Sequence, residues 1–314
     1  MKTDTPTTAA DRLPIPQEAF DWYDEYAHGH IDRRTFLARL GTLAAAGFAT
    51  AALLDALTPN YALAEQVSFN DPDIKATYVT FPSPQGHGQG RGYLVVPAAL
   101  ENQSTKTAPA VLVIHENRGL NPYIQDVARR LAKAGFIALA PDALHPSGGY
   151  PGNDDDGRAM QRALDRAKIE QDMIAAARFL RTVDHGNGKV GAVGFCFGGY
   201  IVNLLAAAAP PDKPPLIDAG VAFYGTPAAK ELRPNIRTPL LIQLAEHDQR
   251  VNATWPEYEQ DLIAAGVDYT MVMYPDTQHG FHNDSTGRYD EEQAQLAWDR
   301  TEAFFDEHLR NTAR

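Results

Sequence analysis

The only cysteine of the chain, Cys196, lies in the segment Gly194–Gly199, which reads GFCFGG. The segment falls between a predicted strand and a predicted helix, where a G-x-nucleophile-x-G spacing holds a nucleophile in a sharp turn. The start of a helix favours a thiolate, and the amide of Phe197 points to where an oxyanion would develop. A lone cysteine is more often an inert core residue, but this position between glycines favours a nucleophile.

A cysteine nucleophile needs a base, and the base needs an acidic group to orient it. Asp248 follows the predicted strand 239–244, and His279 follows the predicted strand 269–274. Nucleophile, acid and histidine in this order, each just past a strand, is the order found in α/β-hydrolases. The sequence therefore predicts a catalytic triad of Cys196, His279 and Asp248.

Neighbouring residues offer alternatives to these assignments. Glu246 is the nearest rival of Asp248 for the acidic place, and Asp276 is a weaker one. His282 forms an H-x-x-H pair with His279, but two histidines without a clustered carboxylate or cysteine are weak evidence for zinc. We therefore predict no metal site.

The segment 115–119 reads HENRG and follows another predicted strand. The second oxyanion amide of an α/β-hydrolase is expected here, and we assign it to Asn117. Glu116 brings an acidic group close to the nucleophile, which is unusual unless it acts on the thiol. Arg118 supplies a cation beside the oxyanion hole or lies in solvent.

A mostly parallel sheet is the element expected to position these side chains. Apolar runs rich in β-branched residues predict strands buried on both faces, at 110–115, 136–140, 189–195, 219–224, 239–244 and 269–274. Two alternating runs around a Pro/Gly-rich turn, 75–80 and 91–96, predict an antiparallel hairpin. Helical patterns separate the later strands. The first predicted helix begins at Asn121-Pro122 and ends at Gly135. The same pattern recurs at 165–183 and 291–309. The fold class is thus α/β, with ligands expected at the carboxyl ends of the strands.

Composition excludes several other classes of protein. The 314 residues are 44% hydrophobic and 22% charged, which suits a globular chain with an ample core. The net charge of -12, without a basic patch, argues against nucleic-acid partners. A single cysteine excludes an intrachain disulfide, and no apolar run reaches the roughly 18 residues of a membrane span. No nucleotide or calcium motif is present, so no cofactor is implied.

The N-terminal extension, residues 1–65, differs from the rest of the chain. A polar tail over 1–16 precedes a predicted helix at 17–28. The sequence Asp32-Arg33-Arg34-Thr35-Phe36-Leu37 then resembles a twin-arginine export signal, followed by an apolar run and by Ala62-Leu63-Ala64, which reads as a cleavage site. This order predicts a periplasmic protein from which residues 1–64 are removed.

The same apolar stretch also fits an uncleaved, cytoplasmic protein. In that interpretation residues 33–57 form one hydrophobic helix that packs against the body or a second subunit, because an apolar helix of that size must be covered. A homo-oligomer formed through this helix is then expected.

With these motifs the sequence resembles the dienelactone hydrolase (carboxymethylenebutenolidase) family over about residues 74–312. The resemblance rests on HENRG, APDAL at 140–144, GFCFGG, the turn at Asp248 and HGF at 279–281. It implies a triad of Cys196, His279 and Asp248. It also matches Glu116 to a glutamate that keeps the resting thiol neutral until substrate displaces it. Thiolate attack would then open a small lactone or ester through a thioester intermediate.

Two departures from the family concern the substrate. Family members that act on dienelactone bind its carboxylate with arginines, and one of these positions is Asn283 here. No arginine before Asp172 matches the other in register, although Arg158 and Arg162 lie nearby. The resemblance leaves open whether a carboxylate-bearing lactone is a substrate.

We expect one α/β-hydrolase domain over residues 66–314 that hydrolyses a small ester or lactone. Besides Arg118, the candidate pocket residues are aromatic, namely Tyr123, Tyr150, Tyr224 and Trp255. A loop over 146–157 crosses the mouth of the site or is a plain solvent loop. A thiol-based redox protein is disfavoured, because no second cysteine can resolve a sulfenic acid. The alternative function is a catalytically degenerate hydrolase fold that serves as a binding or assembly module.

Overall fold

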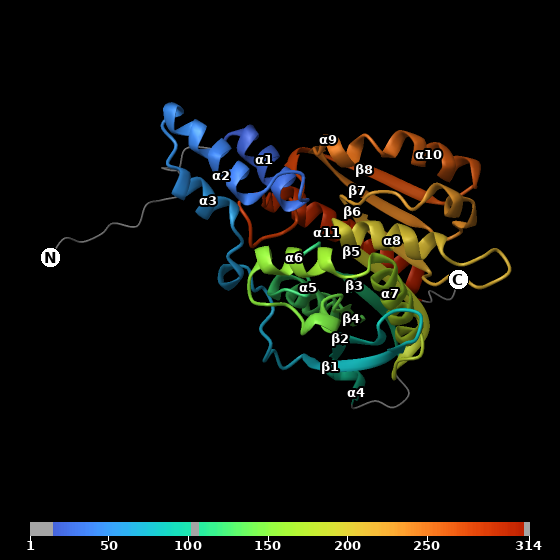
Figure 1. Cartoon of the computed structure of the whole chain (residues 1–314). Coiled ribbons are helices and arrows are strands. Elements are labelled where there is room, and N and C mark those ends of the chain that lie inside the picture. Colours follow the sequence, from blue (N-terminus) through green and yellow to red (C-terminus); the bar gives the residue numbers. More distant parts are fainter. Residues whose placement is uncertain (1–14, 102–106, 311–314) are drawn as a thin grey trace. The chain divides into compact units, whose positions relative to one another are not determined.

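A computed structural model describes residues 15–101 and 107–310 of the chain. Its strands form one sheet in the order β1-β2-β4-β3-β5-β6-β7-β8 (Figure 1). They are β1 (Ile74–Ser83), β2 (Gly88–Pro97), β3 (Ala108–Ile114), β4 (Ile137–Pro141), β5 (Gly186–Phe195), β6 (Ala219–Phe223), β7 (Leu240–His247) and β8 (Tyr269–Gln278). Strands β1 and β2 pair antiparallel, as do β2 and β4, and the pairs from β4 through β8 are parallel. The mostly parallel sheet with a leading hairpin is confirmed.

Helices cover both faces of this sheet. One apolar core joins the sheet to α7 (Arg166–Leu180), α8 (Phe197–Ala207) and α10 (Trp255–Ala264). A second core joins the other face to α5 (Pro122–Lys133) and α11 (Glu291–Leu309). Strands β3 and β4 are buried along their whole length, because each lies between two layers of helices.

The start of α5 shows how the sequence sets an element boundary. The side chain of Asn121 accepts a hydrogen bond from the Ile124 amide at 3.1 Å, and Pro122 occupies the first helical position. At the other end the chain turns at Gly135, whose φ is 89°. These are the limits that the sequence predicts, and they fix the loop between β3 and α5.

The segment expected as a loop over 146–157 is helical at its end. A 3-10 turn covers His145–Ser147, and helix α6 spans Asp154–Ala163. Asn153 caps α6 by accepting from the Asp156 amide at 2.9 Å. The three aspartates therefore occupy the first helical turn, where negative charge is favourable, and the loop prediction was wrong for them.

The described chain divides into two compact units. The first runs to Pro59 and includes Thr286–Arg288, and the second runs from Asn60 to Ser285 and continues from Tyr289. The short helices η3 (Tyr61–Leu63), α4 (Ala98–Glu101), η5 (Lys230–Asn235) and α9 (Gln249–Asn252) belong to the second unit. The candidate catalytic residues also all lie in the second unit.

In the first unit, short helices bury a common apolar core. These are α1 (Gln17–Ala27), α2 (Arg33–Thr42), the 3-10 helix η2 (Leu43–Ala46) and α3 (Thr50–Leu57). A single helix over 33–57 was therefore wrong, because Gly47 takes a φ of 91° and ends the helical run. The core consists of Ala19, Tyr23, Ala27, Phe36, Leu40, Leu53 and Leu57. These helices thus cover much of their apolar surface with one another, and a homo-oligomer stays a prediction.

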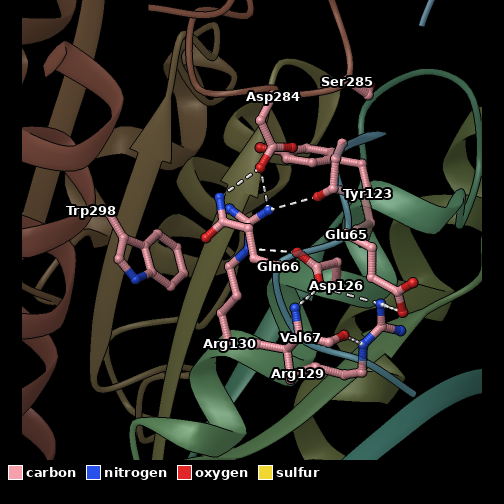
Figure 2. Close-up of polar contacts among 12 residues, drawn as sticks. Glu65, Gln66, Val67, Tyr123, Asp126, Arg129, Arg130, Asp284, Ser285 and Trp298 are labelled. Atoms are coloured by element: carbon pink, nitrogen blue, oxygen red, sulfur yellow. Dashed lines mark hydrogen bonds and ion pairs between the residues drawn. The ribbon is translucent and has the colours of Figure 1, made fainter. Parts of the chain in front are cut away.

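The start of the second unit is held to α5 by a cluster of charged side chains (Figure 2). The Val67 amide donates to Asp126 at 2.9 Å, and Arg129 donates to the Val67 carbonyl at 2.5 Å. Arg130 lies 2.6 Å from Asp126 and 2.5 Å from Asp284. We call Asp126, Arg129, Arg130 and Asp284 the α5 clamp.

Within the described residues, no helix combines the length and apolarity needed to cross a bilayer.

Candidate active site

Cys196 lies in the turn between β5 and α8. Its backbone angles are φ 55° and ψ -109°, a strained conformation for a residue with a Cβ. A Cβ on Gly194 would lie 2.1 Å from the Gly198 carbonyl oxygen, and one on Gly198 would lie 2.1 Å from that of Ile114. The glycines are therefore required by close backbone contacts. Phe197 is the first residue of α8, so its amide has no acceptor within the helix.

The structure brings the three predicted triad residues together. A ring nitrogen of His279 lies within 4.8 Å of Cys196 Sγ. The contact between His279 and Asp248 is shorter, since His279 Nδ1 is 2.5 Å from an Asp248 carboxylate oxygen. Because Nδ1 is engaged with Asp248, Nε2 is the ring atom that can accept a proton. All three side chains are buried, with His279 5% and Asp248 4% exposed.

The rivals of Asp248 lie in other places. Glu246 is exposed, and its carboxylate accepts from the Asp276 backbone amide at 2.8 Å. Asp276 is also exposed. Asp248 itself caps α9 by accepting from the Val251 amide at 3.2 Å. One oxygen thus fixes the loop and the other faces the imidazole.

The His282 ring lies in a buried aromatic environment. Its Nδ1 is 2.7 Å from the Tyr123 hydroxyl, and its ring stacks on Phe195 with centroids 5.2 Å apart. Burial and then the charge of Arg130 hold the pKa of His282 well below its usual value. The imidazole is therefore neutral and supports the residue that precedes the nucleophile.

Glu116 lies in the loop after β3 and is 1% exposed. The side-chain amide of Asn283 donates to its Oε2 at 3.0 Å, and Arg118 Nε lies 3.6 Å from the same oxygen. Asn283 lies in the loop after β8, four residues beyond His279. The acidic group is therefore connected to the loop that carries the candidate base.

The neighbouring His115 fixes the backbone of this loop. The Ala143 amide donates to its Nε2 at 3.2 Å, so Nδ1 carries the proton and donates to the Glu116 carbonyl at 2.5 Å. Burial lowers the pKa of His115, which keeps this tautomer neutral. The HENRG and APDAL segments are thus joined through one imidazole. Asn117, the predicted oxyanion residue, lies directly beyond it in the same loop.

Arg118 is 2% exposed and does not lie in solvent. Its Nη1 is 2.7 Å from Asp154 Oδ2 at the start of α6. The other Asp154 oxygen accepts from the hydroxyls of Tyr61 at 2.7 Å and Tyr150 at 2.9 Å. We call Glu116, Arg118, Asp154, Tyr61 and Tyr150 the Arg118 network.

Electrostatics of the Arg118 network favour an ionised Asp154. Burial alone would raise the pKa of Asp154, but Arg118 and the two tyrosine hydroxyls outweigh it, and the pKa is lowered. Burial beside this carboxylate raises the pKa of Tyr61 and Tyr150, so both hydroxyls remain protonated donors. Asp154 was not among the predicted site residues, and its place in the DDD run offered no signal beyond a polar segment.

The four predicted aromatic residues differ in which side chains they contact. The Tyr224 ring is 4.9 Å from that of His279, and its φ of 36° places it at a strained turn after β6. Tyr123 and Tyr150 are engaged with His282 and Asp154. Trp255 begins α10 in the core, with its ring 4.9 Å from that of Tyr258. Tyr224 is thus the aromatic residue in contact with the candidate base.

The mostly parallel sheet, the turn at Cys196 and the buried imidazole at the sheet's carboxyl edge together define an α/β-hydrolase. Residues 92–309 match the model of the Dienelactone hydrolase family, so the chain belongs to that family and is a hydrolase. Residues 6–45 also match a model described as YqhI-like.

Individual relatives agree with this family. A sequence named as a hydrolase fragment, YghX, of Escherichia coli (strain K12) is 65% identical over 114 residues, covering 36% of this chain and 94% of its own. A protein of Synechocystis named as a carboxymethylenebutenolidase is 31% identical over 256 residues, covering 76% of this chain and 99% of its own. The crystal structure of a dienelactone hydrolase-like promiscuous phosphotriesterase, P91, from metagenomic libraries has a TM-score of 0.63. It is 24% identical and covers 76% of this chain and all of that chain (100%), so this likeness concerns the fold.

Proposed function

We propose that this chain hydrolyses small carboxylic esters or lactones with Cys196 as the nucleophile, His279 as the general base and Asp248 as its orienting group. The amides of Asn117 and Phe197 would hold the oxyanion. The observation that carries the proposal is the Asp248–His279 contact of 2.5 Å on an imidazole that also approaches Cys196 Sγ. It is the arrangement that nucleophile activation needs.

The first half of the reaction transfers the acyl group to sulfur. His279 Nε2 takes the thiol proton, and the thiolate attacks the carbonyl carbon to give a tetrahedral oxyanion. The protonated imidazole then gives its proton to the departing alkoxide, so an alcohol leaves and a thioester remains. With a lactone, the alcohol stays attached to the acyl group and the ring opens.

The second half returns the enzyme to its starting state. His279 takes a proton from water as the oxygen attacks the thioester carbonyl. Collapse of the tetrahedral intermediate breaks the C–S bond, and the thiolate recovers a proton from the imidazolium. The net reaction consumes one water and releases the carboxylic acid. Oriented amides contribute most where negative charge develops on the carbonyl oxygen.

Glu116 is proposed to control the protonation of the thiol. Family resemblance suggests this role, and its supporting observation here is a buried carboxylate held between Asn283 and Arg118. A thiol that ionises only with substrate bound is protected from oxidation while idle. That protection matters because Cys196 is the only cysteine in the sequence, so no second thiol can take its place.

Hydrolysis of p-nitrophenyl acetate tests the proposal. We expect wild-type protein to turn over the ester, and Cys196→Ala and His279→Ala to reduce turnover to the uncatalysed rate. Cys196→Ser is expected to be impaired as well, because a hydroxyl has a much higher pKa than a thiol. Equal rates in all four proteins would remove Cys196 as nucleophile and favour a binding or assembly role for the fold.

The size and charge of the natural substrate require a panel of compounds. Small lactones and esters with and without a carboxylate should be compared at matched leaving groups. Asn283 donates to Glu116 and carries no positive charge, so we propose that neutral substrates react at least as well as anionic ones. A strong preference for the carboxylate-bearing compounds would contradict that ranking.

A further inference from the structure

We propose that Arg118 is a positioning residue that holds the Glu116 carboxylate in place and ionised, and that Asp154 sets how much of the Arg118 charge Glu116 receives. The inference rests on the proposed function, because it concerns how Glu116 does its part. It also assigns Arg118 a role other than binding substrate directly.

Geometry supports a fixed guanidinium. Arg118 Nε lies 3.6 Å from Glu116 Oε2, while Nη1 lies 2.7 Å from Asp154. The two carboxylates thus share one cation from different sides of the guanidinium. Because arginine is planar and always charged, pairing at one edge also sets the direction of the other.

The far end of the Arg118 network is itself anchored. Tyr61 and Tyr150 donate to Asp154, and the side chain of Asn121 donates to the Tyr61 hydroxyl at 2.9 Å. Asn121 is the cap of α5. The position of Asp154 therefore depends on α5, α6 and the segment before β1.

A buried carboxylate without a cation would take up a proton readily, since burial penalises the charged form. Glu116 is 1% exposed, and within residues 15–101 and 107–310 Arg118 is the cation that lies within ion-pair distance of it. Asp154 competes for the same guanidinium. Removing Arg118 and removing the charge of Asp154 should therefore act on Glu116 in opposite directions.

Other titratable groups also face Glu116, and they can be separated from it. His115 and Tyr123 interact with its charge, and Asp142 lies behind His115. Burial lowers the pKa of His115 and raises that of Tyr123 well above its usual value, so both stay neutral in the assay range. Cys196 and His279 are present in every variant compared below, so their own titration is common to all the profiles.

The test is the pH profile of kcat/KM for p-nitrophenyl acetate in full-length variants. We expect Arg118→Met to move the acidic limb upward by about one pH unit, because an opposite charge at this range shifts ionisation by about one to three units. Arg118→Lys, which keeps the charge but not the planar fork, should lie between it and wild type. Asp154→Asn should move the limb down, because Glu116 then no longer shares the guanidinium with a second carboxylate.

Two results would overturn the inference. One is an even loss of rate at every pH in Arg118→Met with an unmoved limb, as a purely structural role predicts. The other is an upward movement of similar size in both Arg118→Met and Asp154→Asn.

Unfolding measurements keep the inference testable if the proposed function fails. Absence of Cys196-dependent turnover in wild type would reject that function, but the pairing still predicts how stability changes. The deficit in thermal midpoint of Arg118→Met should shrink from pH 8 to pH 5, and adding Glu116→Gln should remove part of it at pH 8. A deficit that neither pH nor Glu116→Gln changes would overturn the pairing.

Discussion

The imidazole of His279 and the carboxylate of Asp248 lie 2.5 Å apart although 31 residues separate them in the sequence. Asp248 follows β7 and His279 follows β8, and these neighbouring strands are parallel. Their ends therefore meet at one edge of the sheet, which makes the contact a consequence of topology. Both side chains are buried, so the contact is shielded from bulk water.

We expect Asp248→Asn to lower kcat for p-nitrophenyl acetate by about 10²- to 10⁴-fold, by analogy with the orienting aspartate of serine hydrolases. An asparagine amide can donate to Nδ1, which would leave the proton on Nε2 and remove the base. Steady-state kinetics measure the effect.

Glu246→Gln is the matched control for Asp248→Asn. Glu246 lies near the end of the same strand, β7, but is exposed and accepts from the Asp276 backbone amide. Its rate should stay within about twofold of wild type, as expected for a surface change. A larger loss in Glu246→Gln than in Asp248→Asn would transfer the orienting role to Glu246.

The turn at Cys196 should tolerate no side chain at its glycines. Gly198→Ala would place a Cβ 2.1 Å from the Ile114 carbonyl oxygen, and neither backbone can move without displacing β3 or α8. We expect a loss of about 3 kcal/mol or more in unfolding free energy, since such overlap forces backbone shifts. Urea denaturation followed by circular dichroism measures it.

Gly41→Ala in α2 is the control for this substitution. A Cβ there would meet nothing within 4 Å, and the position is helical. Alanine should be neutral or stabilising by up to about 1 kcal/mol. Equal effects at Gly41 and Gly198 would show that the turn is less closely packed than the structure indicates.

Much of the triad geometry could be predicted from local sequence. Strand ends were marked by apolar runs that stop at polar residues, and the order of Cys196, Asp248 and His279 assigned each to an end of a strand. Parallel pairing of neighbouring strands then brings such ends together without further information. The hairpin of β1 and β2 could also be predicted from local sequence, because its two strands alternate in hydropathy around a Pro/Gly-rich turn.

The remaining contacts depend on partners that are distant in sequence. Tyr61 and Asp154 are 93 residues apart, and Glu116 and Asn283 are 167 apart. No local pattern marks such pairs, and the DDD run at the start of α6 reads equally as a solvent loop. The break at Gly47 was missed because the surrounding apolar residues favour one long helix, whereas a left-handed glycine ends it.

His282 should make the protein less stable in acid. Its pKa is held well below the usual value by burial and by Arg130, whereas an unfolded histidine titrates near 6.5. Above about pH 7.5 it is neutral in both states. As pH falls below about 6.5 only the unfolded chain binds the proton, so stability falls by about 1.4 kcal/mol per pH unit.

We therefore expect His282→Phe to lose less stability than wild type between pH 7.5 and pH 5.5, by about 1 kcal/mol. Phenylalanine suits the ring environment but leaves the Tyr123 hydroxyl without its nitrogen partner, which should cost about 1–3 kcal/mol at pH 7.5. The exposed His30→Gln serves as the control and should keep the wild-type pH dependence. Parallel curves for wild type and His282→Phe would contradict the assignment of a neutral buried imidazole.

The proposed export of the protein predicts where its mature chain begins. Arg33 and Arg34 are exposed at the start of α2, and the predicted cleavage site directly precedes residues held by the α5 clamp. Val67 and Gln66 are bound to Asp126 and Asp284, so the second unit should stay anchored when residues 1–64 are removed (Figure 2). Sequencing the N-terminus of protein recovered from its host should give Glu65, and a chain that starts at Met1 would contradict export.

A version beginning at Glu65 lacks the Tyr61 hydroxyl, but Tyr150 still donates to Asp154. The truncation also removes Tyr61 and Ala64 from the packing of the second unit, so its thermal midpoint should fall by about 5 °C or more.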